Sequence, residues 1–115
     1  MPNLLLDTDV FVDHLRGTRR IEPGAEAIGY SVITRCELFA GPSDQEGAVS
    51  ELLDALQEIE LDGRIAEMAG RIRRETGVLV PDALIAATAI RHGVTLVSAN
   101  RRDYERIPGL ELRAP

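Results

Sequence analysis

A chain of 115 residues with 44% hydrophobic and 28% charged side chains has the composition of a folded protein and excludes a disordered one. This length predicts one domain, residues 1–115, without a separate substrate domain. The net charge is −6 and all 13 basic residues are arginine, which disfavours a protein that coats nucleic acid with a basic surface. Aromatic residues make up only 3% of the chain, so stacking of bases on aromatic side chains is also disfavoured.

The cysteine content and the N-terminus bear on the cellular compartment. Cys36 is the only cysteine, which excludes an intramolecular disulfide and a cysteine-rich zinc site. The N-terminus lacks a basic region followed by an apolar stretch, and no apolar run approaches the roughly 20 residues that a membrane span needs. We therefore expect a cytoplasmic protein that is not inserted into a membrane.

Short apolar runs predict five strands. The first, Leu4–Leu6, is apolar throughout, as in a strand that is buried on both faces, and it ends at Asp7. The other predicted strands lie at residues 28–33, 59–61, 95–98 and 110–112.

Helical spacing of apolar residues predicts a helix after most of these strands. The predicted helices cover residues 10–16, 48–59, 62–76 and 83–92, with a further helix that begins at residue 35 and a short helix or polar loop at 100–107. We expect Thr34 to cap the helix that begins at residue 35. Asp62 should cap the helix at 62–76, and Gly77 should end that helix. The segment 83–90 is almost uninterruptedly apolar, which predicts a helix that is buried on most sides.

This alternation of strands and helices predicts an α/β fold with a mostly parallel sheet and helices on both faces. In such a sheet the binding crevice lies outside the carboxyl ends of the strands. Asp7, Glu37 and the pair Asn100 and Asp103 each follow a predicted strand. Asp82 belongs to the opening turn of the most buried helix. We therefore predict that these side chains meet at one edge of the sheet.

Four acids at one edge repel one another, so some must be protonated or a cation must lie among them. Carboxylate oxygens are the ligands that Mg2+ and Mn2+ prefer, and these ions bridge to substrate phosphates. A phosphodiester is then the expected substrate of a catalytic site built from Asp7, Glu37, Asp82 and Asp103.

Three of these acids also have a structural explanation. Asp82 follows Pro81 and could cap a helix, and Glu37 could complete a capping box with Thr34. Asp103 lies among arginines and could form a surface ion pair. Asp7 lacks such an explanation, because a carboxylate beside a buried strand needs a partner and no basic residue lies near it in sequence.

Four segments contain these acids: residues 5–10 (LLDTDV), 34–41 (TRCELFAG), 82–89 (DALIAATA) and 96–104 (LVSANRRDY). In this order and spacing they resemble the four signature blocks of PIN-domain ribonucleases, in particular the VapC toxins of type II toxin–antitoxin systems. The resemblance runs nearly from end to end of the chain. It implies a PIN fold, which is an α/β/α sandwich with a mostly parallel five-stranded sheet in the order 3-2-1-4-5.

The resemblance also implies Mg2+-dependent endonucleolytic cleavage of RNA, with Mn2+ as a substitute. It implies that Asp7 and Asp82 are the principal metal ligands and that Glu37 is a ligand directly or through water. Asp103 would be the fourth acid of the site, a place that it shares with Asn100. The residues implied to line the site are Thr8, Asp9, Ser98 and Asn100.

The partners follow from the resemblance as well. A toxin of this kind is usually a homodimer, and a cognate VapB-type antitoxin covers its active site, commonly with a basic side chain against the carboxylates. We expect the antitoxin groove on the helices between residues 48 and 76. Four arginines at or beside the predicted edge are candidates for contacts with RNA phosphates: Arg16, Arg35, Arg101 and Arg102.

Two other functions compete with this interpretation. The segment 4–10 also resembles the opening of haloacid-dehalogenase-type phosphatases, in which the first aspartate is a nucleophile. Those enzymes normally need a downstream lysine, and this chain contains none. A binding module without activity is the other alternative, and it would be indicated by a broken set of acids, which the chain does not show.

Overall fold

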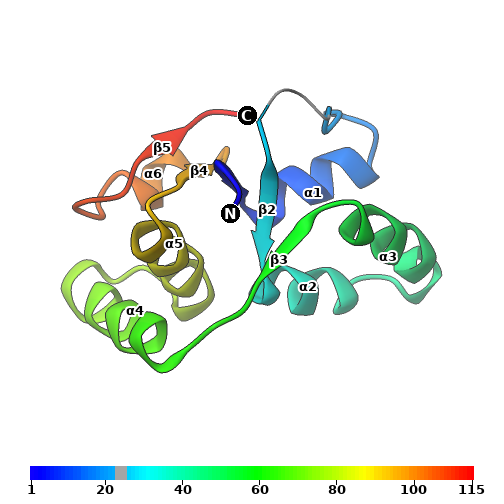
Figure 1. Ribbon diagram of the computed structural model, residues 1–115. Helices are drawn as coiled ribbons and strands as arrows, with labels where there is room; N and C mark the ends of the chain where they lie inside the picture. Colours follow the sequence, from blue (N-terminus) through cyan, green and yellow to red (C-terminus); the bar gives the residue numbers. More distant parts are fainter. Residues whose placement is uncertain (23–25) are drawn as a thin grey trace.

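The computed structural model describes residues 1–22 and 26–115. Its centre is a five-stranded parallel sheet in the order β3-β2-β1-β4-β5, which confirms the predicted strand order (Figure 1). The strands are β1 (Leu4–Leu6), β2 (Ile28–Ser31), β3 (Gln57–Ile59), β4 (Thr95–Val97) and β5 (Leu112–Arg113). β1 is the middle strand, and Leu5 pairs with Gly29 of β2 on one side and with Leu96 of β4 on the other.

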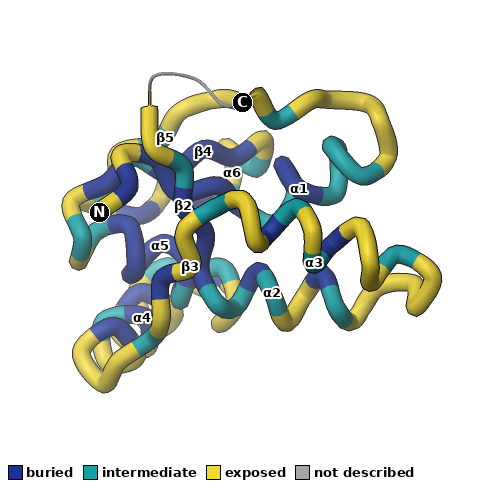
Figure 2. Tube along the Cα trace, turned by 45° about the vertical axis from the view of Figure 1, so that its right-hand side comes forward, coloured by how far each residue is buried: buried dark blue, intermediate teal, exposed yellow. Residues whose placement is uncertain are grey.

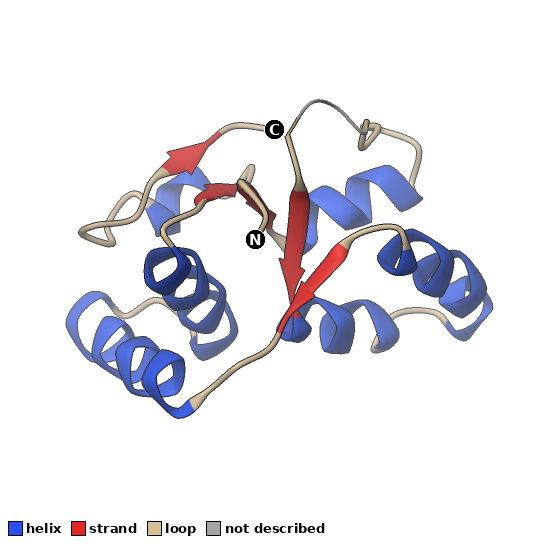
Figure 3. Cartoon of the chain, viewed as in Figure 1, coloured by secondary structure: helices blue, strands red, loops and turns tan. Residues whose placement is uncertain are grey.

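Helices cover both faces of this sheet, as predicted (Figure 3). They are α1 (Thr8–Leu15), α2 (Val32–Phe39), α3 (Glu46–Asp54), α4 (Gly63–Thr76), α5 (Val80–His92) and α6 (Arg101–Tyr104), with a short 3-10 helix at Ser43–Gln45. In Figure 1, α4 and α5 lie to the left of the central strands, and α1, α2 and α3 lie to the right. Among the described residues, no helix combines the length and apolar character needed to cross a membrane.

Each face of the sheet has its own hydrophobic core, and β1 contributes to both. Leu5 packs with buried residues of α4, α5 and α6, whereas Leu4 and Leu6 pack with Phe11 of α1 and Leu53 of α3. Successive side chains of a strand point to opposite faces, so an all-apolar strand is the sequence signature of this position. The buried residues accordingly run through the middle of the molecule in Figure 2, and exposed residues cover the outer helices.

Helix α5 is buried along most of its length because small side chains let it approach the sheet and α4. Its alanines at positions 83, 86, 87 and 89 are fully buried. The helix ends at Gly93, whose φ of 65° is a left-handed conformation that favours glycine. These features confirm the prediction from the apolar segment 83–90.

Four helices, α1, α2, α3 and α5, begin two or three residues earlier than predicted, and the starts of α2 and α5 bear on candidate site residues. Helix α2 begins at Val32, and its N-cap is Ser31, whose hydroxyl accepts a hydrogen bond from the backbone N–H of Ile33 at 3.1 Å. The prediction that Thr34 caps this helix is therefore wrong. The capping box of Thr34 with Glu37 is excluded for the same reason. A serine that ends a strand in extended conformation was the better cap.

Helix α5 begins at Val80, three residues earlier than expected, with Pro81 in its first turn. Asp82 therefore lies inside the helix and is not its N-cap, which excludes the capping explanation of this residue. For α4 the predicted ends are confirmed, since Asp62 Oδ1 accepts from Ile65 N at 2.9 Å and Gly77 has a φ of 78°.

Two predicted strands are displaced. β3 covers Gln57–Ile59 instead of 59–61, and the preceding helix ends at Asp54 instead of 59. Pairing with β2 decides this register, because Gly29 lies opposite Gln57 and Ser31 opposite Ile59. At the other edge β5 is Leu112–Arg113 instead of 110–112. Both are short edge strands, where the apolar pattern of the sequence is weakest.

Candidate active site

The carboxyl ends of the central strands carry the polar side chains of the candidate site. Asp7 directly follows β1 and is the N-cap of α1, and Ser98 directly follows β4. Glu37 lies on α2, the helix after β2, and Asp82 lies in the first turn of α5. Because parallel strands end at the same edge, the topology brings these four residues to one place.

Asp7 is the most buried acid of the site, with 4% of its surface exposed. Its Oδ1 accepts hydrogen bonds from the backbone N–H of Thr8 at 2.9 Å and from the Tyr104 hydroxyl at 3.1 Å. Its Oδ2 accepts one from the Ser98 hydroxyl at 2.8 Å. Burial raises the pKa of Asp7 to about 6, and the hydrogen bond from Ser98 offsets only part of that effect.

Asp9 extends the acidic surface beside Asp7. Its Oδ2 accepts a hydrogen bond from the backbone N–H of Ala99 at 3.0 Å and lies 3.4 Å from the Ser98 hydroxyl. Its Oδ1 is buried and has no hydrogen-bond partner among the residues that the structure describes. Burial also raises the pKa of Asp9. An unpartnered carboxylate oxygen next to a second buried acid is an open position for a positively charged ligand.

Glu37 is held by a chain of hydroxyl groups. The Thr8 hydroxyl donates to Glu37 Oε1 at 2.7 Å, and the Thr34 hydroxyl lies 3.0 Å from the Thr8 oxygen. A hydroxyl has one proton, so because Thr8 donates to Glu37, the hydrogen bond between Thr8 and Thr34 is donated by Thr34. Thr34 is fully buried, and its place inside α2 directs its hydroxyl to this chain instead of to the end of the helix.

Asp82 experiences the charges of the other acids. Burial raises its pKa most, followed by the negative charge of Glu37, and the charges of Asp103 and Asp9 act in the same direction. The nearby Tyr104 hydroxyl lowers it. Glu37, Asp103 and Asp9 are therefore close enough to Asp82 to destabilise its charged form.

Asp103 and Asn100 are connected to each other. Asn100 caps α6, its Nδ2 donates to Asp103 Oδ2 at 3.1 Å, and Asp103 also forms an ion pair with Arg106 at 3.4 Å. The predicted surface ion pair of Asp103 is thus confirmed. A hollow of about 540 Å3 lies against Asn100, Arg102, Asp103 and Arg106.

The four arginines proposed to contact RNA have different surroundings. Arg35 forms an ion pair with Glu58 of β3 and donates to the Tyr30 hydroxyl at 2.9 Å, so it contacts none of the candidate acids. Arg101 pairs with the exposed Glu105 one turn away. Arg16 and Arg102 each line a hollow that borders a candidate acid, Glu37 in one case and Asp103 in the other.

Tyr104 is a site residue that the sequence did not indicate. It lies at the end of α6, its side chain is fully buried, and its hydroxyl reaches an acid 97 positions earlier in the chain. Burial and the charges of Asp7 and Asp82 raise its pKa. In the sequence Tyr104 is one aromatic residue in a polar segment, and no spacing marks it as a partner of Asp7.

The set of oxygen ligands fits a divalent cation. Asp7 and Asp9 are hard oxygen donors whose burial disfavours their charged forms, and Asp9 Oδ1 has a free buried position. In the described part of the chain no three acidic, histidine or cysteine side chains already stand in the arrangement of a metal-ligand shell. The acids instead accept hydrogen bonds from Ser98, Tyr104 and Thr8.

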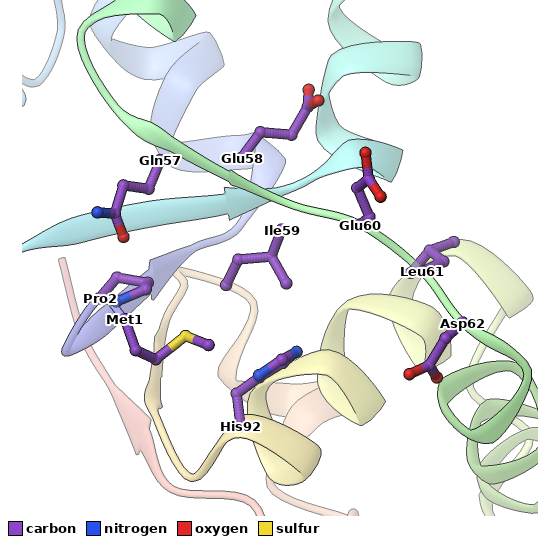
Figure 4. A pocket seen from close by; sticks show the side chains of 9 residues that line it. All are labelled: Met1, Pro2, Gln57, Glu58, Ile59, Glu60, Leu61, Asp62 and His92. Atoms are coloured by element: carbon purple, nitrogen blue, oxygen red, sulfur yellow. The ribbon is translucent and has the colours of Figure 1, made fainter.

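A separate hollow of about 620 Å3 lies between the N-terminus, β3 and His92 at the end of α5 (Figure 4). Three acids line it, namely Glu58, Glu60 and Asp62. Two of them already have partners, because Glu58 pairs with Arg35 and Asp62 caps α4. None of the predicted site residues lines this hollow, which leaves the edge around Asp7 as the candidate active site.

Sequence comparison identifies the class of protein to which this sheet order and acidic edge belong. Residues 4–110 match the PIN domain family, and the chain belongs to that family. Ribonuclease VapC19 of Mycobacterium tuberculosis is a relative with 34% identity, and the alignment covers 93% of this chain and 96% of the relative.

Solved structures agree with this assignment. A toxin–antitoxin complex from Klebsiella pneumoniae contains a chain with 32% identity and a TM-score of 0.80, and the match covers 93% of this chain and 94% of that chain. A DNA-bound VapBC from Salmonella typhimurium contains one with 25% identity and a TM-score of 0.83, covering 99% and 98%.

Proposed function

We propose that this protein is a metal-dependent endoribonuclease of the VapC kind, the toxin of a toxin–antitoxin pair. The observation that carries this proposal is the group of acids around Asp7 at the carboxyl edge of the sheet. Among the described residues, Asp7, Asp9, Glu37 and Asp82 form no ion pair with a basic side chain. Relatives named as ribonucleases support the assignment of the substrate.

Asp7 and Asp82 are the proposed metal ligands, with Glu37 and Asp103 as the further catalytic acids. A bound Mg2+ or Mn2+ ion would lower the pKa of an attacking water and offset charge at the phosphorus centre. Ser98 holds the Asp7 carboxylate through Oδ2, and Thr8 holds Glu37. Asp9 Oδ1 leaves a further oxygen available at this edge.

The RNA backbone has a proposed contact surface beside these acids. Arg102 and Arg106 line the same hollow as Asn100 and Asp103, so their guanidinium groups can meet a phosphate next to the one that is cleaved. Arg16 borders Glu37 from the side of α1. Of the four predicted arginines, Arg16 and Arg102 are therefore the stronger candidates for RNA contacts.

The antitoxin is proposed to be a VapB-type protein with an apolar segment and a basic side chain. A hollow of about 360 Å3 between α1, α2 and α3 suits such a segment, because Val12, Leu15, Leu38 and Val49 line it and Glu37 borders it. The expected groove on residues 48–76 is a different surface. Val49 is the one residue of that range that lines this hollow. We also propose that the protein is cytoplasmic and homodimeric.

Cleavage of RNA by the purified protein tests the catalytic part of this proposal. We expect Mg2+-dependent cleavage that is abolished by EDTA, by Asp7→Asn and by Asp82→Asn. Asp62→Asn is a matched control, because Asp62 caps α4 and asparagine is an equally good cap. Cleavage by Asp7→Asn at the parental rate contradicts the proposal. Turnover of a phosphomonoester without RNA cleavage would favour the phosphatase alternative.

Binding of the protein encoded next to this chain tests the partner. We expect Leu15→Ala to weaken that complex and to leave RNA cleavage intact, because it removes apolar surface from the hollow and adds no charge beside Glu37 and Arg16. An unchanged affinity would exclude this hollow as the antitoxin site. Sedimentation of the free protein tests the homodimer.

A further inference from the structure

The Tyr104 hydroxyl is a buried polar group to which the proposed function assigns no role. Its proton is donated to Asp7 Oδ1 at 3.1 Å, and the negative charge of Asp82 also acts on it and raises its pKa. Asp7 comes from the end of β1, Asp82 from α5 and Tyr104 from α6. One hydroxyl therefore faces both of the proposed metal ligands, which reach the site from different elements.

The hydrogen bonds of Asp7 show what this contact does. Thr8 N and the Tyr104 hydroxyl occupy Oδ1, and the Ser98 hydroxyl occupies Oδ2. A carboxylate offers about four acceptor positions, so these three donors leave about one for a cation. The donors approach from three segments of the chain and together fix the orientation of the carboxylate. The position that stays open is consequently fixed as well.

We propose that Tyr104 is a positioning residue of the metal site, whose buried hydroxyl orients the carboxylate of Asp7 toward a divalent cation that Asp7 shares with Asp82. This inference rests on the proposed function. Partners that orient metal ligands are typically worth about 10- to 100-fold in metal affinity or activity. Tyr104 does not contact the substrate in this role and acts only through Asp7.

If Tyr104 only filled space in the core, its replacement by phenylalanine would leave the metal affinity unchanged. Tyr104 also belongs to the core formed with α4 and α5, and a phenylalanine would fill that space equally well. The chain offers a matched control, because it contains only two tyrosines and both are buried. Tyr30 packs in the other core, and its hydroxyl accepts from Arg35 instead of donating to a candidate acid.

Metal binding by Tyr104→Phe and Tyr30→Phe separates the two roles. Calorimetric titration with Mn2+ alone should show an affinity about 10- to 100-fold weaker for Tyr104→Phe than for the parent, and within about twofold of the parent for Tyr30→Phe. The Mg2+ concentration at half-maximal RNA cleavage should rise by a similar factor for Tyr104→Phe. Equal Mn2+ affinity of the two variants would overturn the proposal.

A second measurement needs no substitution at Tyr104. Biosynthetic labelling with fluorotyrosine places one fluorine reporter at each of the two tyrosines, and Tyr30→Phe assigns the two resonances. Addition of Mg2+ should shift the Tyr104 resonance and leave the Tyr30 resonance in place. A Tyr104 resonance that does not respond to saturating Mg2+ contradicts the proposal even where Tyr104→Phe fails to fold.

The experiments distinguish this inference from the function on which it rests. If the parent binds Mn2+ and cuts RNA but Tyr104→Phe behaves as the parent does, only the role of Tyr104 is wrong. If the parent neither binds Mn2+ nor cuts RNA, the proposed function fails and the role of Tyr104 fails with it.

Discussion

Asp7 destabilises the folded, metal-free chain at neutral pH. Burial raises its pKa to about 6 from an ordinary value of 3.8, so between these values the folded chain binds more protons than the unfolded chain. Protonation of Asp7 therefore stabilises the folded chain. This stabilisation is complete below a pH of 3.8 and is lost as the pH rises through about 6. The difference between the two pKa values corresponds to about 3 kcal/mol.

Asp7→Asn should therefore increase the stability of the metal-free protein at neutral pH while it abolishes cleavage. We expect urea unfolding in EDTA to give a larger free energy of unfolding for Asp7→Asn than for the parent at about pH 7.5, and a smaller difference at about pH 4.5. Asparagine can keep the bonds from Thr8 and Tyr104 through its carbonyl oxygen, and Ser98 can turn its proton toward Asp9. A variant less stable than the parent at both pH values would show that the charge of Asp7 is well compensated.

The hydroxyl chain that ends at Glu37 gives a second prediction at this scale. Thr34→Val keeps the shape of the side chain but removes the hydroxyl that donates to the Thr8 oxygen and orients the Thr8 proton toward Glu37. We expect cleavage at saturating Mg2+ to slow by about 5- to 10-fold, as for the loss of a hydrogen bond worth about 1 kcal/mol. Thr34→Ser restores the hydroxyl and should restore most of the rate. Equal rates for the valine and serine variants would exclude the hydroxyl chain.

At the scale of elements, the close pairing of β2 leaves no room for a side chain at Gly29. A Cβ at this position would lie 2.6 Å from Pro2 Cγ and 3.1 Å from the Gln57 carbonyl oxygen of β3. We expect Gly29→Ala to lower the free energy of unfolding by about 1–3 kcal/mol, because the backbone of β3 must move. Urea unfolding with Gly70→Ala as the control checks this.

Gly70 lies in the middle of α4, and nothing lies within 4 Å of a Cβ placed there. Gly70→Ala should raise the free energy of unfolding by about 0.5–1 kcal/mol, because alanine has the higher helix propensity. The two glycine substitutions are thus expected to have opposite signs. If both substitutions lowered the free energy of unfolding, crowding around Gly29 would not be the cause of the loss in Gly29→Ala.

The elements themselves could largely be predicted from the sequence, and the errors have a common cause. The all-apolar β1, the apolar α5 and the capped α4 depend on local patterns, and their positions were correct or nearly so. The start of α2 was missed because Ser31 and Thr34 are both good caps, and only the burial of Thr34 against Thr8 decides between them. β3 depends on its partner strand, which a local pattern does not contain.

At the scale of the whole molecule, the candidate site follows from topology more than from any single residue. Two rules predicted that Asp7, Glu37 and Asp82 converge, although they are far apart in sequence: the strand order, and the position of binding sites at the carboxyl ends of parallel strands. Neither rule predicts Tyr104 or the free oxygen of Asp9, because both depend on how side chains of α6 and of the loop after β4 pack against α1. Such contacts emerge only when the chain is folded.

If the acids of the proposed site bind a metal ion, its binding is coupled to the stability of the entire molecule. A cation that binds only the folded chain raises the free energy of unfolding by about 2.7 kcal/mol at 100 times its dissociation constant. In a chain of 115 residues this corresponds to a rise in Tm of about 11 °C. We expect Mg2+ or Mn2+ to produce such a rise at about pH 7.5.

The size of this rise should depend on pH with a defined sign. Burial raises the pKa of Asp7, Asp9 and Asp82, so protons compete with the cation as the pH falls toward 6 and below. The rise in Tm should therefore shrink between about pH 7.5 and about pH 5, and Asp82→Asn should abolish it at both. Asp62→Asn should leave it unchanged, because that acid only caps α4. A rise of equal size at both pH values would place the cation away from these acids, and the proposed catalytic site would then have to be assigned elsewhere.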